Sequence, residues 1–257
     1  MTPWAPFHHP GEYAFDTRRT KKLWEQLHAG DQEPLPVDDK VLAAWSLFHS
    51  GEFQKAAELG LQCGPQGATV ANKATCTYAN YLEPKEKTRQ SLFLQVAERA
   101  QAQTGVEPEN ANAFYWQAYA LGRYSQGISV AKALAQGMGG KVKAALEKAL
   151  ALQPRHADAH VALGAFHAEV IDKVGALIGN MTYGAKKETS LGLFEQALVL
   201  VPQSAIARIE YANALVILEG DKRMEEATRL YEQASALPAL DATARLDSEM
   251  AQTELAS

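Results

Sequence analysis

PENANA (108–113), PRHADA (154–159) and PQSAIA (202–207) share the pattern P-x-x-A-x-A. The second and third follow similar apolar phrases, ALALQP ending at Pro154 and ALVLVP ending at Pro202. Proline lacks the N–H that a helix interior requires, and it disfavours a helical residue before it. Each stretch therefore predicts the end of one helix, a short link and the alanine-led start of the next. Because the phrase recurs, the sequence predicts repeated helix–turn–helix units.

The rest of the chain is also predicted to be helical. Ala, Leu, Gln, Glu and Lys dominate the repeated part, and no alternating run of Val, Ile and Thr indicates a strand. Further helices are expected over about 16–28, 38–49, 54–63, 70–82, 85–103 and 241–255, separated by links that contain Pro or Gly. We expect residues 1–36 to form an N-terminal extension with one short helix, preceded by a loose arm over 1–15. Residues 37–257 are expected to form the repeat domain, closed by a C-terminal capping helix.

The units resemble the tetratricopeptide repeat (TPR), whose pattern places an aromatic residue, Leu-Gly, Tyr, Ala, a bulky residue, Ala and Pro in order. In the best copy these positions hold His160, Leu163, Gly164, His167, Ser190, Phe194, Ala197 and Pro202. The resemblance covers most of residues 38–240. It implies an all-α fold, a right-handed superhelix of about five helix pairs.

Two of the units are longer than an ordinary TPR. Pro154 lies 46 residues after Pro108, and Pro202 lies 48 residues after Pro154, whereas an ordinary repeat takes about 34 residues. The additional residues fall between the paired helices, within 123–143 and 169–190, and each insert contains an apolar segment followed by glycines. Because surface loops would be more polar, we expect short extra helices that pack on the superhelix or close over its groove.

This arrangement resembles the regulator-of-microtubule-dynamics family of TPR proteins. The phrase LEKALALQPRHADAHVALG (146–164) carries the resemblance, which extends over about 110–250 and implies a helical-repeat fold with a role in assembly. A second resemblance is to the TPR component associated with TRAP-type transporters, which implies a trimer built around a ligand passage. The chain lacks the lipobox cysteine of those lipoproteins.

The bulk composition narrows the class of partner. The formal net charge is −5 and the only dense basic cluster is RRTKK at 18–22, so no nucleic-acid partner is expected. No stretch approaches the ~20 apolar residues that cross a bilayer, and the first residues do not resemble a signal peptide. The two cysteines, Cys63 and Cys76, fit reduced thiols, and a cytoplasmic location is expected.

Three histidines raise the hypothesis of a metal site. His156 and His160 lie four residues apart and His160 and His167 seven apart, a spacing that places them on one helix face. His160 and His167, however, occupy the aromatic positions of the TPR pattern, and no nearby cysteine or paired carboxylate completes a ligand set. Packing is therefore the preferred interpretation. GMGG at 137–140 lacks the Lys-Ser/Thr of a phosphate loop. We expect no enzyme activity, no metal and no cofactor.

The first helix of each TPR pair lines the concave surface, where ligands lie. Projected onto this sequence, that rule predicts a groove lined by Trp45, Phe48, Asn72, Tyr115, Tyr119, Arg123, Val161, Glu169, Ile209, Asn213 and Val216. The set is mainly apolar and aromatic, with few of the cations that capture an acidic peptide. It suits an amphipathic helix or a hydrophobic small molecule better.

Three hypotheses for function follow. The leading one is a scaffold or adaptor that binds a segment of a protein partner in the apolar groove. The alternative is a binding protein for a hydrophobic small molecule or lipid, enclosed by the inserts. In the third, the inserts or the N-terminal arm fill the groove, and the chain is a self-plugged subunit of a homo-oligomer. An open channel would favour the peptide, and a closed cavity the small ligand.

Overall fold

The computed structural model describes residues 3–256, and every regular element in that range is a helix. The α-helices are α1 (Thr17–Leu27), α2 (Asp39–His49), α3 (Phe53–Gln62), α4 (Ala68–Tyr81), α5 (Glu86–Val106), α6 (Ala111–Gln126), α7 (Val130–Ala135), α8 (Met138–Leu152), α9 (Ala157–Val174), α10 (Ala176–Tyr183), α11 (Lys187–Leu200), α12 (Ala205–Glu219), α13 (Met224–Ala236) and α14 (Ala242–Ala256). Two 3₁₀ helices, η1 (Gly64–Gly67) and η2 (Gly220–Arg223), precede α4 and α13. Residues 1, 2 and 257, which the predicted extension and repeat domain include, lie outside the described residues.

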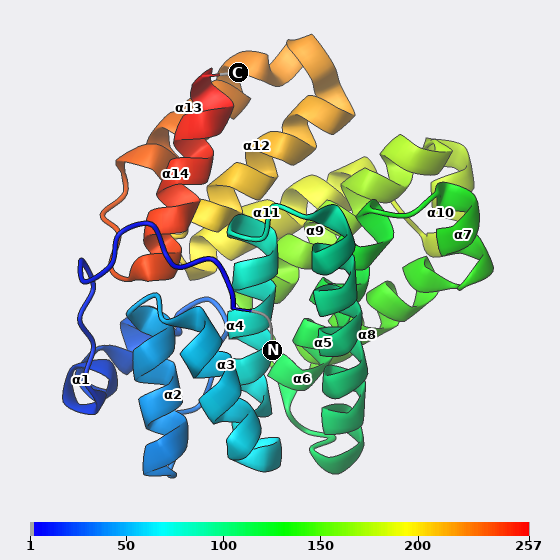
Figure 1. Cartoon of the computed structure of the whole chain (residues 1–257). Coiled ribbons are helices and arrows are strands. Elements are labelled where there is room, and N and C mark those ends of the chain that lie inside the picture. The colour runs from blue at the N-terminus through cyan, green and yellow to red at the C-terminus, as the bar shows by residue number, and fades with distance from the viewer. Residues whose placement is uncertain (1–2, 257) are drawn as a thin grey trace.

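The α-helices form five packed pairs: α2 with α3, α4 with α5, α6 with α8, α9 with α11, and α12 with α13. Consecutive pairs stack on one another, so the chain winds as a superhelix with α14 against the last pair (Figure 1). The predicted all-α superhelix of about five pairs is confirmed, together with its capping helix. The helix ends lie within about three residues of the predicted ones, as expected for helix boundaries.

The repeated P-x-x-A-x-A phrase has a common structural role. The residue two positions after each proline is an N-cap whose side chain accepts the backbone N–H of the second alanine: Asn110 from Ala113 at 3.2 Å, His156 from Ala159 at 3.1 Å and Ser204 from Ala207 at 3.1 Å. All three alanines are fully buried. The cap satisfies a free N–H at the helix start, and the methyl side chain lets that turn lie close to its neighbours.

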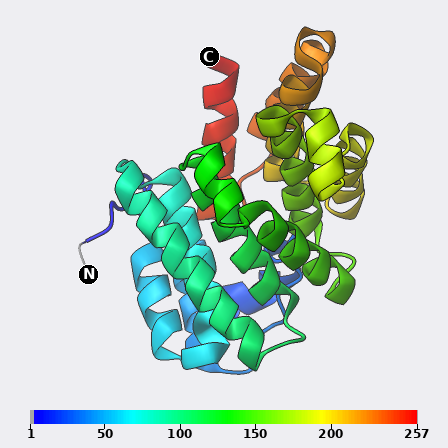
Figure 2. The same ribbon diagram turned by 90° about the vertical axis from the view of Figure 1, so that its right-hand side faces the viewer.

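The two inserts form the short helices that the sequence predicts. α7 lies between the paired helices α6 and α8, and α10 lies between α9 and α11. Both are at the same end of the molecule, on the right of Figure 1, and Figure 2 turns this end toward the viewer. A Cβ at Gly139 would lie 2.8 Å from the ring of Tyr183, so the first turn of α8 packs directly on α10.

Residues 3–15 of the N-terminal arm are packed, and for them the prediction of a loose arm is wrong. Phe7, Tyr13 and Phe15 are buried in the main hydrophobic core. Trp4 stacks on Tyr78 of α4, with ring centroids 4.3 Å apart. These rings remove apolar surface from water along the first two helix pairs, so the arm belongs to the folded unit.

A buried polar cluster ties the extension to the superhelix. His28 Nδ1 lies 2.9 Å from an oxygen of Asp31, and Lys73 of α4 donates to the other oxygen of Asp31 at 2.6 Å. Although burial raises the pKa of Asp31, the neighbouring Lys73 and His28 outweigh it and hold that pKa well below its usual range. Burial lowers the pKa of His28 to about 4. The pair Asp31–Lys73 is therefore ionised beside a neutral histidine at pH 7.

α14 reaches further than a simple cap. Ala251 packs with Ile209 of α12, as a cap would. At its other end, Asp241 contacts His49 of α2, with Oδ2 and Nδ1 2.6 Å apart, and Tyr81 of α4 donates a hydrogen bond to Asp247. The C-terminal helix thus connects the last repeat to the first two.

The close approach of α9 and α11 can be tested at Gly164. A Cβ there would lie 2.9 Å from the ring of the fully buried Phe194, so Gly164→Ala is expected to lower the free energy of unfolding by about 1–3 kcal/mol. Gly192 of α11 has open space where a Cβ would lie. Gly192→Ala should therefore raise the free energy of unfolding by about 0.5–1 kcal/mol, because alanine is the better helix former. Urea denaturation measures both. Equal effects of the two substitutions would contradict the predicted helix contact.

A second prediction concerns Asp247, whose pKa burial raises to about 7. An unfolded aspartate titrates near pKa ~3.9, so the folded state keeps a proton that the unfolded state loses. The contribution of this carboxyl to stability therefore falls as the pH rises from about 4 to about 7 and stays lost above that.

Asp247→Asn keeps the acceptor for Tyr81 and cannot ionise. The stability of this variant relative to the unmodified protein should rise by at least about 1 kcal/mol between pH 5 and pH 8. Urea denaturation of both proteins at the two pH values measures it. A difference that does not change with pH would show that Asp247 titrates normally.

Candidate functional site

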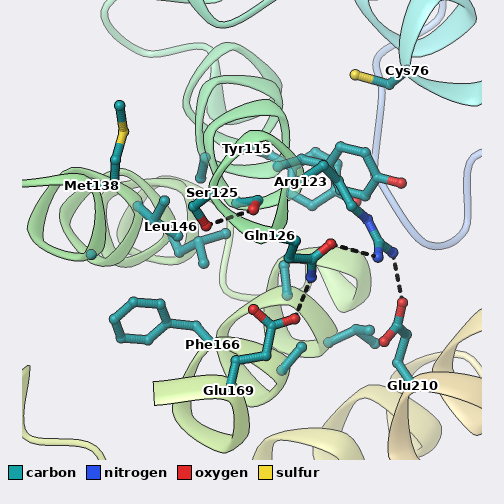
Figure 3. Close-up of a pocket in the computed structure, with 18 of the residues that line it drawn as sticks. Cys76, Tyr115, Arg123, Ser125, Gln126, Met138, Leu146, Phe166, Glu169 and Glu210 are labelled. Carbon is teal, nitrogen blue, oxygen red and sulfur yellow. Dashed lines mark hydrogen bonds and ion pairs between the residues drawn. The ribbon is translucent and has the colours of Figure 1, made fainter. Parts of the chain in front are cut away.

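A cavity of about 270 Å³ lies on the concave side of the superhelix. Side chains of α4, α6 and α9 form its walls, and residues of the inserts line it from the other side. Figure 3 shows residues of α4, α6, α8 and α9 around it. Most of the lining is aromatic or aliphatic: Tyr81, Tyr115, Trp116, Tyr119, Ile128, Val130, Leu134, Met138, Val142, Leu146, Val161, Phe166, Val170, Val174 and Tyr183. A concave apolar site of this kind is typical of ligand-binding pockets.

α6 supplies the aromatic wall of the cavity. Tyr115, Trp116 and Tyr119 form a cluster whose ring centroids lie 4.9–6.0 Å apart. Their spacing along a helix of 3.6 residues per turn puts Tyr115 and Tyr119 one above the other. Gly122, one turn further on the same face, has no atom within 4 Å of the position of a Cβ, so the wall is recessed there.

The inserts supply the opposite wall. Val130 and Leu134 come from α7, Met138 from the start of α8 and Tyr183 from α10. Met138 is buried, and Tyr183 is half-buried against the core. The extra residues of the two long repeats therefore lie over the concave surface.

Polar side chains bridge the helices at the edge of the cavity. Arg123 of α6 donates to Glu210 of α12 at 2.7 Å, and Gln126 of α6 donates to Glu169 of α9 (Figure 3). Burial lowers the pKa of Arg123, but Tyr119 and Glu210 outweigh it and raise that pKa above its usual range. Burial raises the pKa of Glu169. Arg123 is therefore a fixed cation that is already engaged by the protein.

Two buried carboxyl groups also line the cavity. Burial raises the pKa of Asp158 to about 6, and the nearby Asp31 adds to the effect. Burial likewise raises the pKa of Asp247 to about 7, although the hydrogen bond from Tyr81 opposes the shift. Near neutral pH Asp247 is therefore only partly ionised, whereas Asp158 is mostly ionised, so the cavity carries less negative charge than two carboxylates would give it.

The structure distributes the eleven predicted groove residues over three places. Tyr115, Tyr119, Arg123, Val161 and Glu169 line the cavity. Arg123 and Glu169 also line a second hollow, toward the C-terminal end of the superhelix, together with Asn213 and Val216. The last four, Trp45, Phe48, Asn72 and Ile209, are buried and line neither.

The chain itself covers the predicted groove at the first repeat. Trp24 and His28 of the extension pack edge-on against Trp45, with centroids 5.8 and 4.5 Å away. The following link crosses to α9, where the N–H of Asp158 donates to the carbonyl of Gly30 at 3.1 Å. The TPR register places Trp45 correctly on the inner face but carries no information about what covers it.

The sequence predicted that the inserts pack on the superhelix or close over its groove, but not which of their residues line the cavity. Val130, Leu134, Met138 and Tyr183 line the cavity but were not among the predicted residues. The apolar composition of the two inserts was the signal that pointed to them. Asp247 could not have been found in this way, because it reaches the cavity from the C-terminal helix.

The histidines have structural roles. His156 caps α9 through Nδ1 and donates from Nε2 to Asn112 (2.9 Å), His160 lies 3.0 Å from the carbonyl of Pro154, and His167 accepts from the N–H of Lys186 at 3.3 Å. Within residues 3–256, no group of three or more His, Cys, Asp or Glu side chains is arranged to hold a metal ion. None of the described helices is both long and apolar enough to span a bilayer.

A comparison with solved structures identifies a TPR protein of similar fold. TTC0263, a thermophilic TPR protein of Thermus thermophilus, matches with a TM-score of 0.58 and 16% sequence identity, covering 84% of this chain and 98% of its own. A mutant of MamA covers 84% of this chain and 99% of its own at 14% identity, with a TM-score of 0.39. The likeness to TTC0263 supports the TPR-type superhelix and extends to the fold alone. A comparison with curated protein sequences gave no match.

The family comparison covers a large part of the chain. Residues 66–256 match the family described as regulator of microtubule dynamics protein 1-3. This range includes four of the five helix pairs, both inserts and α14. The long repeats and their inserted helices are therefore part of the matched region, and the chain belongs to the regulator of microtubule dynamics family of TPR-type proteins.

Proposed function

We propose that this protein is a non-enzymatic binding module whose cavity holds the apolar part of a ligand. The TPR-type fold supports a binding role in general, because stacked repeats create extended concave surfaces. The proposal of an apolar ligand rests on the cavity of about 270 Å³. Aromatic side chains of α6 form one wall of this cavity, and residues of the inserts line the opposite side. The size of the cavity lies just below the usual range of small-molecule pockets, which is ~300–1,000 Å³.

The N-terminal extension covers part of the predicted groove, which favours a small hydrophobic ligand over a long peptide. Trp24 and His28 cover Trp45, and the link at Gly30 reaches α9. A partner helix lying along the whole concave surface would have to displace these buried groups. A single apolar chain or ring system requires only the space that remains.

The chemistry of the cavity supports a largely uncharged ligand segment. The three cationic side chains of its lining each have a carboxylate partner. Arg123 pairs with Glu210, Lys73 with Asp31 and Lys173 with Asp172. The buried Asp158 would oppose an additional anion deep in the cavity. The contacts available to a ligand are therefore mainly ring faces and aliphatic carbons, for which burial of apolar area is the driving force.

A partner segment remains a second candidate because of the hollow beside the cavity. Asn213 and Val216 of α12 line this hollow, and Arg123 and Glu169 line both spaces. A short polypeptide segment anchored there would place one apolar side chain in the cavity. Val216→Glu should release such a polypeptide and leave a small apolar ligand bound, which distinguishes the two candidates by mass spectrometry of the bound species.

The cavity proposal predicts that filling the recess at Gly122 blocks binding. Gly122→Leu adds a side chain where no atom lies within 4 Å of the Cβ position, and it replaces glycine inside a helix with a better helix former. The uncharged dye N-phenyl-1-naphthylamine is a suitable probe, because its fluorescence rises when it moves from water into an apolar cavity. We expect at least about tenfold weaker binding, equivalent to ~1.4 kcal/mol.

Gly192→Leu is the matched control, because Gly192 is also an unobstructed glycine inside a helix but lies outside the cavity. It should bind the probe as the unmodified protein does, and thermal melting should show both variants folded. Failure of the unmodified protein to bind the probe would refute the proposal. Equal affinity in the Gly122 variant would place the binding elsewhere.

A further inference from the structure

The outer face of α10 is apolar although it faces solvent. Leu177, Ile178 and Met181 are 74%, 57% and 81% exposed. At 100° per residue they occupy one arc of the helix, and the opposite arc contains Gly179 and Tyr183, which pack on the core. An exposed helix face would ordinarily be polar, and a cluster of large apolar side chains indicates an interaction site.

α7 extends this apolar surface toward the cavity. Val130 and Leu134 lie one turn apart on α7 and are also exposed. Both inserts lie at the same end of the molecule, and Gly139 of α8 packs on Tyr183 of α10, which holds them together (Figure 2). We call the five exposed side chains on α7 and α10 the insert patch: Val130, Leu134, Leu177, Ile178 and Met181.

The charges around the insert patch are mainly positive. Residues 127–143 and 172–188 contain six lysines and only two carboxylates, whereas the whole chain has 25 Lys and Arg against 30 Asp and Glu. Lys132, Lys141 and Lys186 are exposed, and no carboxylate of residues 3–256 forms an ion pair with them. Lys132 also lies over the ring of Tyr124, 5.8 Å from its centroid. The patch therefore combines protruding apolar groups with exposed cations on a protein whose net charge is negative.

We propose that the insert patch docks the protein on the surface of an anionic lipid bilayer. The side chains of α10 would enter the boundary between headgroups and acyl chains, and the lysines would contact phosphate or carboxylate headgroups. Interfacial helices bind by this combination of apolar burial and electrostatic attraction. The helix would lie in the plane of the interface, which is consistent with its eight residues being too few to cross it.

The same features disfavour other occupants of the patch. A second copy of the chain packed through a two-fold axis would bring like-charged lysines together. A partner helix needs a groove, whereas Leu177 and Met181 project outward from a convex helix face. A bilayer requires neither a groove nor a complementary shape.

The insert patch lies next to the cavity, but the docking proposal does not require that the cavity binds a ligand. Val130, Leu134 and Lys173 belong to the cavity lining as well as to this end of the molecule, so docking would turn the cavity toward the bilayer. Vesicle binding measures docking and probe binding measures the cavity. Either proposal can therefore fail alone.

Co-sedimentation of the full chain with vesicles tests the docking proposal. The vesicles contain phosphatidylcholine alone or with about one-third phosphatidylserine, which supplies the negative surface potential. The unmodified protein should sediment with the anionic vesicles, less so at high salt, and at least tenfold more weakly with phosphatidylcholine alone. The double variant Leu177→Glu, Met181→Glu should lose at least tenfold in binding to the anionic vesicles.

The matched control is the double variant Val106→Glu, Val199→Glu, which adds the same charge at two similarly exposed valines on α5 and α11. It should keep most of the binding. Equal loss in the two double variants would mean that net charge alone matters and would overturn the proposal. So would an unmodified protein that ignores anionic vesicles, or one that forms a dimer through Leu177 and Met181 instead.

Discussion

The structure depends on how the first helix of each of the last three pairs begins. Asn110, His156 and Ser204 each cap a helix by accepting the N–H of an alanine that is fully buried. A capped, alanine-led first turn can lie against the preceding pair without an unsatisfied backbone group between them. Repeating this close contact turns each pair relative to the last and creates a concave side. The cavity exists because that side is curved.

Much of this architecture could be predicted because it is encoded locally. Proline, glycine and the apolar period mark the helix ends, and the repeated phrase sets the register of the pairs. The register also placed Tyr115, Tyr119 and Val161 on the inner face, where they line the cavity. The inserts were recognised as helices because their composition was too apolar for surface loops.

The contacts between distant parts of the chain could not be predicted. Phe7 lies in a segment with no helical period, yet its ring packs at Gly51, where a Cβ would be 2.5 Å away. Tyr81 and Asp247 are separated by 166 residues and meet only in the folded chain. Because of such contacts the extension covers Trp45, and only part of the predicted groove is left as a cavity. A repeat pattern predicts how each helix pair packs on its neighbour, but it does not predict contacts between distant parts of the chain.

We propose that the remaining concave space holds an apolar small molecule, and native mass spectrometry of protein purified gently from its own host can test this. A bound species of drug-like or lipid-like size that leaves on denaturation is the expected result. A co-purifying polypeptide would contradict this claim and make the protein a scaffold for that partner. A bare oligomer would also contradict it and support a self-plugged subunit.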